Sequence, residues 1–313
     1  MRVVLITVCG RKKFLKIQRP YIESLKHVVD EHHLWVNTEN PEDLAYLEEM
    51  QKSDPDHFKL IRRPTFLHDR FDENGSPSVH SVGQMISPFF KNCVEQDTVY
   101  VRIDDDVCFI EVDVFQSYVD FRVAHPEYFL VFPVIVNNCM DFRVFPRSHP
   151  FCQSGYEEET DWRPHGGQIG LHLHNCFFSN PLSSLKFEND GVRGCGEMAA
   201  INCISWLGSE FAKFDGMVAW NKDHYEQEEE WLIRDKPNQI GKQNCIFGGM
   251  VVCHYSFAHQ RAPYHTYFGD GLDLDTTDVL ERYEFLSLEH MAGVKRFDEI
   301  PLSHGNQERI TLL

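Results

Sequence analysis

The sequence is short of positive charge and of long apolar runs. Among its 313 residues, 30 Lys and Arg stand against 48 Asp and Glu, which gives a formal net charge of −18 at pH 7. A protein that grips the backbone of DNA or RNA normally carries a basic excess, so polymeric nucleic acid is not an expected partner. A membrane-spanning helix needs about 20 nearly continuous apolar residues. Apolar stretches such as residues 129–136 are far shorter, so we expect no transmembrane segment.

Paired cysteine motifs are also missing. The ten cysteines include no CxxC pair, which argues against a zinc ribbon and a thiol redox motif. Cys203 and Cys253 lie within apolar segments, where a reduced thiol behaves as a small hydrophobe. The amino-terminal apolar stretch, residues 3–8, is too short and wrongly ordered for a secretory signal. We therefore expect free thiols and a cytoplasmic protein.

Apolar and aromatic residues, by contrast, are plentiful enough for a packed core, at 42% and 13% of the chain. In the first third, strand-like and helix-like segments alternate, which predicts a parallel sheet covered by helices. Asn40 followed by Pro41 predicts a helix start, because asparagine is a good N-cap and proline fits the first helical position. The expected strands are 3–8, 33–36, 58–61, 98–103 and 129–136, the expected helices are 14–28, 41–50, 78–93 and 111–123, and 62–77 is expected to be a surface loop.

The second half follows a less regular pattern. A stretch rich in proline and glycine, residues 146–170, precedes a helix-like segment at 198–214. A charged segment, 221–234, precedes a strand-like run at 249–254. We expect residues 280–313 to form a helix followed by a loop.

Three consecutive aspartates, Asp104, Asp105 and Asp106, follow the expected strand 98–103. In open α/β sheets, ligands bind at the carboxyl edge of the strands. Adjacent carboxylates repel one another, and a hard divalent cation relieves that repulsion. The alternative is a strand-to-helix turn in which an aspartate caps the next helix. The apolar strand before the aspartates favours a metal site.

Residues 1–136 resemble the donor-binding half of the nucleotide-sugar-dependent glycosyltransferases of the GT-A fold. The features that carry the resemblance are the strand 3–8, its short polar loop and helix, the following strand and helix alternations, and the DxD motif of Asp104 and Asp106. The resemblance implies an α/β fold: a Rossmann-like, mostly parallel sheet with helices on both faces and a less regular carboxy-terminal acceptor region. It also implies that Asp106 binds Mn²⁺ or Mg²⁺ at the donor diphosphate, with Asp104 near the ribose and the metal and Asp105 between them.

The resemblance further implies a nucleotide site at the ends of the first two strands, formed by residues Val8, Gly10, Arg11 and Asn37 or Thr38. The residues themselves add a basic rim, because the cations of 11–13 follow the first strand and those of 62–63, including Arg63, follow the third. Cations at a helix start oppose the helix dipole. The rim is therefore either a site for a diphosphate or a solvated helix start.

Two further assignments come from the second half. Many GT-A enzymes bring a carboxy-terminal histidine to the metal, and His254 ends the strand-like run 249–254; the alternative is a structural histidine. Inverting members place their general base at an acidic helix start. Glu229, with Glu228 as its substitute, is our choice for that base. The alternative is an ordinary acidic first turn of a helix.

Other polar residues of the second half are less specific. If their segment is a strand, His172 and His174 share one face of it and offer two ligands for a separate metal, although the spacing identifies no third ligand. Trp162 and His165 lie where an acceptor sugar would need an aromatic platform and hydrogen-bond donors.

Together these features predict a metal-dependent glycosyltransferase that moves a sugar from a UDP- or GDP-linked donor to a hydroxyl of a carbohydrate or glycoconjugate acceptor. Residues 1–136 would bind the donor, 137–279 would bind the acceptor and complete the catalytic site, and 280–313 would form a tail. One alternative is a sugar nucleotidyltransferase, although the first loop holds a single glycine, Gly10, rather than a glycine-rich phosphate loop. The other is a non-catalytic carbohydrate-binding protein of the same fold.

Overall fold

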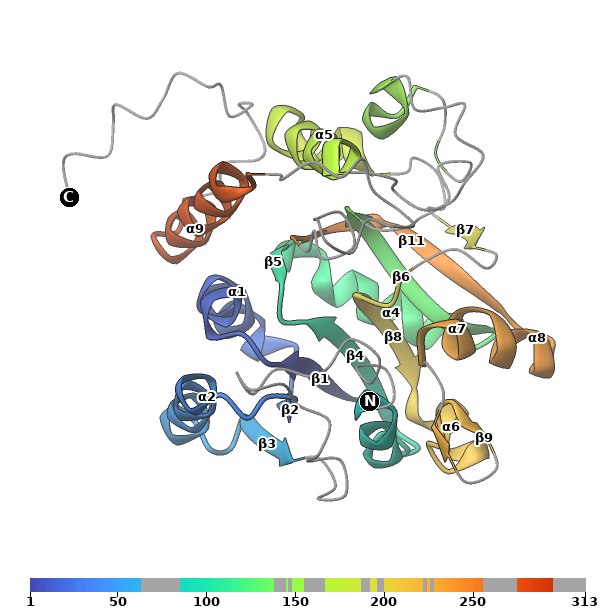
Figure 1. Cartoon of the computed structure of the whole chain (residues 1–313). Helices are drawn as coiled ribbons and strands as arrows, with labels where there is room; N and C mark the ends of the chain where they lie inside the picture. Colours follow the sequence, from blue (N-terminus) through green and yellow to red (C-terminus); the bar gives the residue numbers. More distant parts are fainter. Residues whose placement is uncertain are drawn as a thin grey trace.

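A single large twisted sheet forms the centre of the molecule (Figure 1). The computed structural model describes residues 1–62, 85–137, 145, 148–154, 167–186, 192–195, 200–221, 224–225, 228–255 and 275–294. Within them the sheet has the strand order β3-β2-β1-β4-β8-β6-β11-β5, and β7 pairs with β11. Its strands are β1 Arg2–Cys9, β2 Glu31–Val36, β3 Phe58–Arg62, β4 Thr98–Asp104, β5 Val107–Ile110, β6 Tyr128–Val136, β7 Val192–Cys195, β8 Cys203–Leu207 and β11 Gln243–His254.

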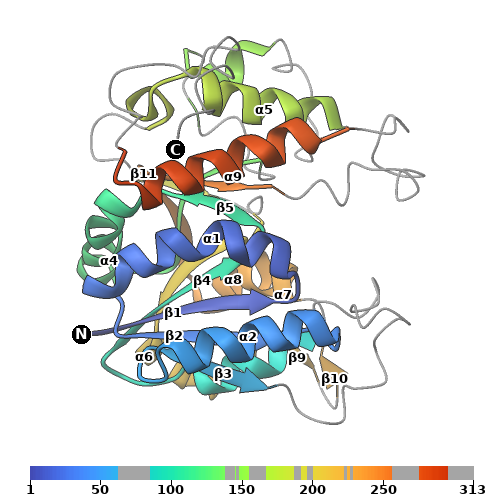
Figure 2. The same cartoon turned by 90° about the vertical axis from the view of Figure 1, so that its left-hand side faces the viewer.

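Helices cover both faces of this sheet. Figure 2 shows α1, α2 and α9 in front of the strands and α7 and α8 behind them. The α-helices are α1 Lys12–Ser24, α2 Pro41–Ser53, α4 Phe115–Ala124, α5 Gly167–Ser179, α6 Gly208–Phe211, α7 Glu228–Glu230, α8 Lys236–Ile240 and α9 Thr277–Met291. Shorter 3-10 turns span Leu25–His27, Ser87–Asn92, Val112–Val114, Pro150–Ser154, Leu182–Leu185 and Ala212–Phe214. A π-helix at Trp231–Asp235 joins α7 to α8, and a small separate ribbon pairs β9 Trp220–Asn221 with β10 His224–Tyr225.

The first third follows the sequence prediction closely. β1 pairs in parallel with β2 on one side and β4 on the other, and β2 pairs in parallel with β3. The apolar residues of β1 are buried, as expected for a strand covered on both faces. Asn40 caps α2, because its side chain accepts hydrogen bonds from the backbone N–H groups of Glu42 and Asp43. The predicted α/β class, with a mostly parallel sheet and helices on both faces, is confirmed.

The segment expected as a helix at 198–214 is instead a strand followed by short helical turns. β8 runs antiparallel between β4 and β6, and four of its five residues are buried. A strand buried on both faces has a continuous apolar run, and periodicity alone does not separate such a run from a buried helix. β8 ends at Leu207, and the short helix α6 and the 3-10 turn Ala212–Phe214 follow it in place of the single long helix we expected.

β5 is a second strand that we did not anticipate. It follows the three aspartates directly and pairs antiparallel with β11. The sequence prediction moved straight from the aspartates to a helix at 111–123, whereas a 3-10 turn and α4 begin only after β5. In the segment expected as a helix at 78–93, the residues described from 85 onward form mainly the 3-10 turn Ser87–Asn92.

Two expectations from the composition concern membrane-spanning helices and the state of the cysteines. Among the described helices, none combines the length and the apolar character needed to cross a bilayer. The cysteines whose side chains are described are free thiols, as predicted: Cys9, Cys93, Cys108, Cys152, Cys176, Cys203, Cys245 and Cys253.

Candidate functional site

The three aspartates lie where the carboxyl ends of several strands meet. β4 ends at Asp104, and Asp105 and Asp106 form the turn into β5. β5 pairs with the end of β11, with Val107 opposite His254, so Asp106 comes next to that histidine. The backbone N–H of Tyr255 donates to the Asp106 carbonyl at 2.8 Å, which fastens the two segments together. Carboxylates at 104 and 106 and the imidazole at 254 therefore converge, as the sequence predicted for the metal ligands.

The chemistry of this group suits a divalent ion. One ligand atom from each of Asp104, Asp106 and His254 lies within 4.8 Å of the others. His254 Nε2 lies 3.3 Å from Asp106 Oδ1, so two ligand atoms already face one another. Carboxylate oxygens suit Mg²⁺ and Mn²⁺, and imidazole is a common ligand of transition metals. These three residues fit a metal centre.

Both oxygens of the Asp104 side chain accept hydrogen bonds. Arg102 Nη2 donates to Oδ1 and Asn202 Nδ2 donates to Oδ2, each at 3.0 Å. The backbone N–H of Asp104 also donates to the Asn202 carbonyl at 2.9 Å. The orientation of this carboxylate is thus set by two side chains that the sequence analysis did not single out, Arg102 on β4 and Asn202 just before β8.

Gln18 is another residue that the sequence analysis missed. It lies on the buried face of α1 and is fully buried. Its Nε2 donates to the carbonyl of Asp104 at 2.9 Å and to that of Val107 at 3.1 Å, so one amide group bridges the turn that holds the aspartates. The available signal was a glutamine within an otherwise apolar helical stripe.

Asp105 binds the loop that follows β1. Its Oδ2 accepts from the Gly10 N–H at 2.8 Å, and its Oδ1 accepts from Arg11 Nε at 2.9 Å and from Arg11 Nη2. Burial raises the pKa of Asp105 to about 6, with a further increase from the Asp106 charge and an opposing effect of Arg11. The middle aspartate therefore fastens the β1 loop to the β4 turn.

Asp106 and His254 form the charged pair of the site. Burial raises the pKa of Asp106, but the positive charges of Arg11, 3.0 Å away at Nη2, and of His254 outweigh it, so the pKa is lowered. For His254, burial lowers the pKa and the Asp106 charge raises it, and the net direction is upward. His254 Nδ1 also lies 3.3 Å from the Asn137 carbonyl, which orients the ring. A carboxylate that remains charged at low pH is the form that binds a cation.

The residues expected at the nucleotide gather around Gly10. Val8 lies opposite Asp104 in the parallel register of β1 and β4. A Cβ at Gly10 would lie 3.3 Å from the Asn37 carbonyl, so the two strand ends approach closely there. Asn37 and Thr38 are buried beside this loop, and within the described ranges Asn37 Oδ1 accepts no hydrogen bond. Arg63 lies outside the described residues, and so do Trp162 and His165.

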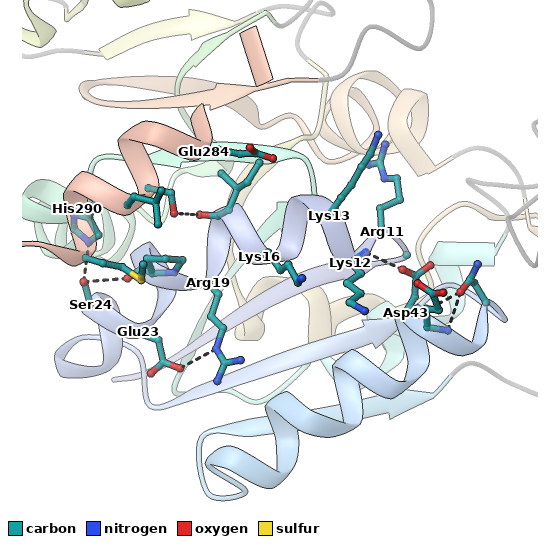
Figure 3. A pocket seen from close by; sticks show the side chains of 18 residues that line it. Arg11, Lys12, Lys13, Lys16, Arg19, Glu23, Ser24, Asp43, Glu284 and His290 are labelled. Carbon is teal, nitrogen blue, oxygen red and sulfur yellow. Dashed lines mark hydrogen bonds and ion pairs between the residues drawn. The ribbon is translucent and has the colours of Figure 1, made fainter. Parts of the chain in front are cut away.

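The expected basic rim is divided between two places. Arg11 pairs with Asp105 and Asp106. Together with Lys12, Lys13 and Lys16 it also lines a groove that follows α1 between the start of α2 and the face of α9 (Figure 3). The groove has a volume of about 1290 Å³ and contains acidic as well as basic side chains. At the end of β3, Arg62 pairs instead with Glu48 of α2 at 3.3 Å. Of these described cations, Arg11 is the one that pairs with the aspartates.

The glutamates at 228–230 begin a helix, as the sequence predicted, but their surroundings differ. Glu228 is buried, and its Oε1 lies 3.8 Å from Arg102 Nη1. Glu229 is half-buried; burial, together with the charges of Glu228 and Asp104, raises its pKa to about 7. Glu230 is exposed and pairs with Arg234 at 3.3 Å. One of the three thus combines partial exposure with a pKa near neutrality.

The pair His172 and His174 does not form a shared site, because α5 is a helix and not the strand on which that possibility depended. Residues two apart on a helix point in different directions. His172 Nε2 lies 3.1 Å from Cys176 Sγ, one turn along the helix. His174 Nδ1 lies 2.7 Å from the hydroxyl of Tyr283 on α9, in the core. The condition for a second metal site at these residues is therefore not met.

Solved structures similar to this chain include a galactosyltransferase in complex with donor and acceptor sugar analogues, at 11% identity and a TM-score of 0.44, covering 96% of this chain and 98% of that one. A CMP:2-keto-3-deoxy-manno-octonic acid synthetase complexed with CTP has 11% identity and a TM-score of 0.44, covering 92% and 99%. A 4-diphosphocytidyl-2C-methyl-D-erythritol synthase has 8% identity and a TM-score of 0.41, covering 91% and 99%. No protein-family model matches the chain, and no curated protein matches it. The sheet described above, not these likenesses, defines its α/β class.

Proposed function

We propose that this protein is a metal-dependent glycosyltransferase that moves a sugar from a nucleoside-diphosphate sugar to a hydroxyl group of a carbohydrate or glycoconjugate. The observation that carries the proposal is the convergence of Asp104, Asp106 and His254 within 4.8 Å at the end of β4 and β11. That group lies beside the loop after β1, where Gly10 and Arg11 contact Asp105. Open α/β sheets bind their ligands at this edge.

In the proposed site, Asp104, Asp106 and His254 hold Mn²⁺ or Mg²⁺. When bound, such an ion neutralises the negative charge that develops on a nucleoside diphosphate as it leaves. Arg11 adds a fixed positive charge next to the same group, because it pairs with both Asp105 and Asp106. Val8, Gly10, Asn37 and Thr38 would form the wall that receives the base and ribose, and Arg63 would extend it.

Glu229 is the proposed general base for an inverting reaction. A base must be deprotonated near neutral pH and still attract a proton, so its pKa should lie close to the working pH. Glu229 meets this condition with a pKa of about 7. Glu228 is less suited, because it is buried and faces the Arg102 guanidinium.

Thermal unfolding with nucleotides tests the proposal directly, because a ligand that binds the native state raises the unfolding midpoint. UDP, GDP, CDP, CMP and ATP are each added with and without Mn²⁺. We expect one nucleoside diphosphate to raise the midpoint only with Mn²⁺ present, and the increase to disappear in Asp106→Asn. Asp56→Asn is the matched control, because Asp56 is exposed and lies far along the chain from the site.

The remaining outcomes of this experiment are informative in different ways. A response to ATP alone would favour nucleotidyl transfer over glycosyl transfer. No response to any nucleotide, with or without Mn²⁺, would contradict the proposal and favour a binding protein of the same fold. A metal-dependent response that persists in Asp106→Asn would contradict the proposed ligand set.

A further inference from the structure

Arg102 is a buried arginine beside the candidate metal site, and the proposed reaction gives it no direct role. It belongs to β4, two residues before Asp104, so both side chains emerge on the same face of the strand. The residue is 2% exposed. Removing a guanidinium from water is costly unless acidic groups surround it. The burial of Arg102 is therefore explained by the acidic side chains that its guanidinium contacts.

Two acidic residues from distant parts of the chain flank this guanidinium. Nη2 donates to Asp104 Oδ1 at 3.0 Å, and Nη1 lies 3.8 Å from Glu228 Oε1. Within the described residues, Nε and Nη1 make no hydrogen bond. Pairs between arginine and a carboxylate are frequently bidentate, with contacts of about 2.7–2.9 Å. Here the Arg102 guanidinium is shared between Asp104 on β4 and Glu228 at the start of α7. Neither carboxylate binds all of its N–H groups.

The consequence for Asp104 is a fixed orientation. Its Oδ1 is held by Arg102 and its Oδ2 by Asn202, so the carboxylate is set before any cation arrives. Hydrogen bonds of this kind orient metal ligands and raise the affinity of the site. The consequence for α7 is that its first residue is drawn toward β4, which carries the adjacent Glu229 with it.

We propose that Arg102 is a positioning residue that holds the metal ligand Asp104 and the acidic start of α7 in one unit. This inference rests on the proposed function, because it assigns Asp104 to a metal and Glu229 to the acceptor side. Arg102 itself touches neither substrate nor metal. It sets the place of the groups that do, and the same guanidinium compensates the charges of both Asp104 and Glu228.

The test measures Mn²⁺ binding to the full-length, metal-free protein by titration calorimetry, in the absence of any sugar donor. Arg102→Met should weaken Mn²⁺ binding by about tenfold or more, the effect typical of removing a partner of a metal ligand. Arg102→Lys, which keeps the charge and can donate one hydrogen bond, should recover part of the affinity. Such a recovery would not follow from a generally loosened core.

Arg122 provides the matched control. It is the other buried arginine of the described residues, on α4, and it donates to the His125 carbonyl rather than to an acidic residue of the site. Arg122→Met should lower the unfolding midpoint but leave Mn²⁺ affinity unchanged. Equal losses of Mn²⁺ affinity in Arg102→Met and Arg122→Met would overturn the inference, because a structural role alone would then explain both.

A second variant covers the possibility that Arg102→Met fails to fold, since Glu228 would be left as an uncompensated buried acid. Arg102→Met combined with Glu228→Gln removes both charges of the pair. We expect this double variant to fold and to bind Mn²⁺ at least about tenfold more weakly than Glu228→Gln alone. Equal Mn²⁺ affinity in the double variant and in Glu228→Gln would overturn the inference while leaving the proposed function intact. A wild-type protein that binds no Mn²⁺ would overturn both.

Discussion

Individual ionisable residues differ in this site according to what surrounds them. Three consecutive aspartates look equivalent in the sequence, yet Asp105 bonds to the β1 loop while Asp106 faces His254. Their pKa values are shifted in opposite directions, upward for Asp105 by burial and downward for Asp106 by Arg11 and His254. The sequence specifies the residue type, but the charge state of each aspartate depends on the neighbouring groups in the folded protein.

The raised pKa of Glu229 predicts a specific pH dependence of stability. Burial and nearby acids raise this pKa to about 7, above the ordinary value of 4.5. Between these two values the folded protein binds more protons than the unfolded chain, so this residue makes stability fall as the pH rises. Replacing Glu229 with Gln removes the free-energy cost of ionising this carboxyl in the folded protein. In metal-free protein, Glu229→Gln should therefore raise the unfolding midpoint at pH 8 and change it little at pH 4.

Glu230→Gln is the control for this measurement, because Glu230 is exposed on the same helix. Its substitution removes an ion pair with Arg234 rather than a buried charge, so it should not raise the midpoint at pH 8. A Glu229→Gln variant whose stability follows that of the wild type at every pH would show that Glu229 has an ordinary environment.

The same residue predicts an effect on rate. If Glu229 removes the acceptor proton, Glu229→Gln should lower kcat by about 100-fold or more, the usual contribution of a general base. Wild-type kcat should fall as the pH drops below about 7, where Glu229 becomes protonated. Initial rates across pH 5 to 9 with a saturating donor would measure both, and a full rate in the variant would reassign the base.

At the scale of elements, the turn between β4 and β5 depends on α1. Gln18 donates to carbonyls on both sides of the aspartates. Gln18→Met keeps the length of the side chain but leaves two buried carbonyls without this donor, which should cost about 1–3 kcal/mol of unfolding free energy. Chemical denaturation would measure it. Gln116→Met, at an exposed position of α4, should change stability by less than about 0.5 kcal/mol.

The N-cap of α2, unlike the role of Gln18, was predicted from the sequence, and it also gives a testable stability change. Asn40 accepts from the N–H groups of Glu42 and Asp43 at 2.9 and 3.4 Å. Asn40→Ala should lower the unfolding free energy by about 1 kcal/mol. Asn238→Ala, at an exposed position in α8, is the comparison and should be nearly neutral. Equal effects of the two substitutions would mean that the cap contributes nothing.

At the scale of the whole molecule, the central sheet joins both halves of the chain. β6 lies between β8 and β11, and both of these neighbours come from beyond residue 200. A fragment of residues 1–136 would therefore contain β6 without any strand beside it. We expect this fragment to show no cooperative unfolding, whereas the full chain should unfold with β4, β8 and β6 in one transition. Near-UV circular dichroism during denaturation would distinguish the two.

This prediction bears on the division of the chain at residue 136. The division between a donor half, residues 1–136, and an acceptor half, 137–279, stays a prediction about function. Cooperative unfolding of the isolated fragment 1–136 would show that the first half is also an independent folding unit.

The sequence by itself determined the features that depend on neighbouring residues. The strand at 3–8, the cap at Asn40, the acidic start of α7 and the aspartates after a buried strand are local patterns, and each occurs in the structure. His254 was nominated because it ends a strand-like run and because the resemblance to GT-A enzymes implies a carboxy-terminal histidine at the metal.

Only the tertiary structure decided the features that depend on distant residues. Whether 203–207 is a strand or a helix is decided by the open edges of β4 and β6, which its own apolar run does not reveal. The separate surroundings of His172 and His174 follow from the helical geometry of α5. Arg102 meets Glu228 because the sheet brings β4 under α7. Contacts of this kind depend on packing between segments far apart in the chain, and no local pattern encodes them.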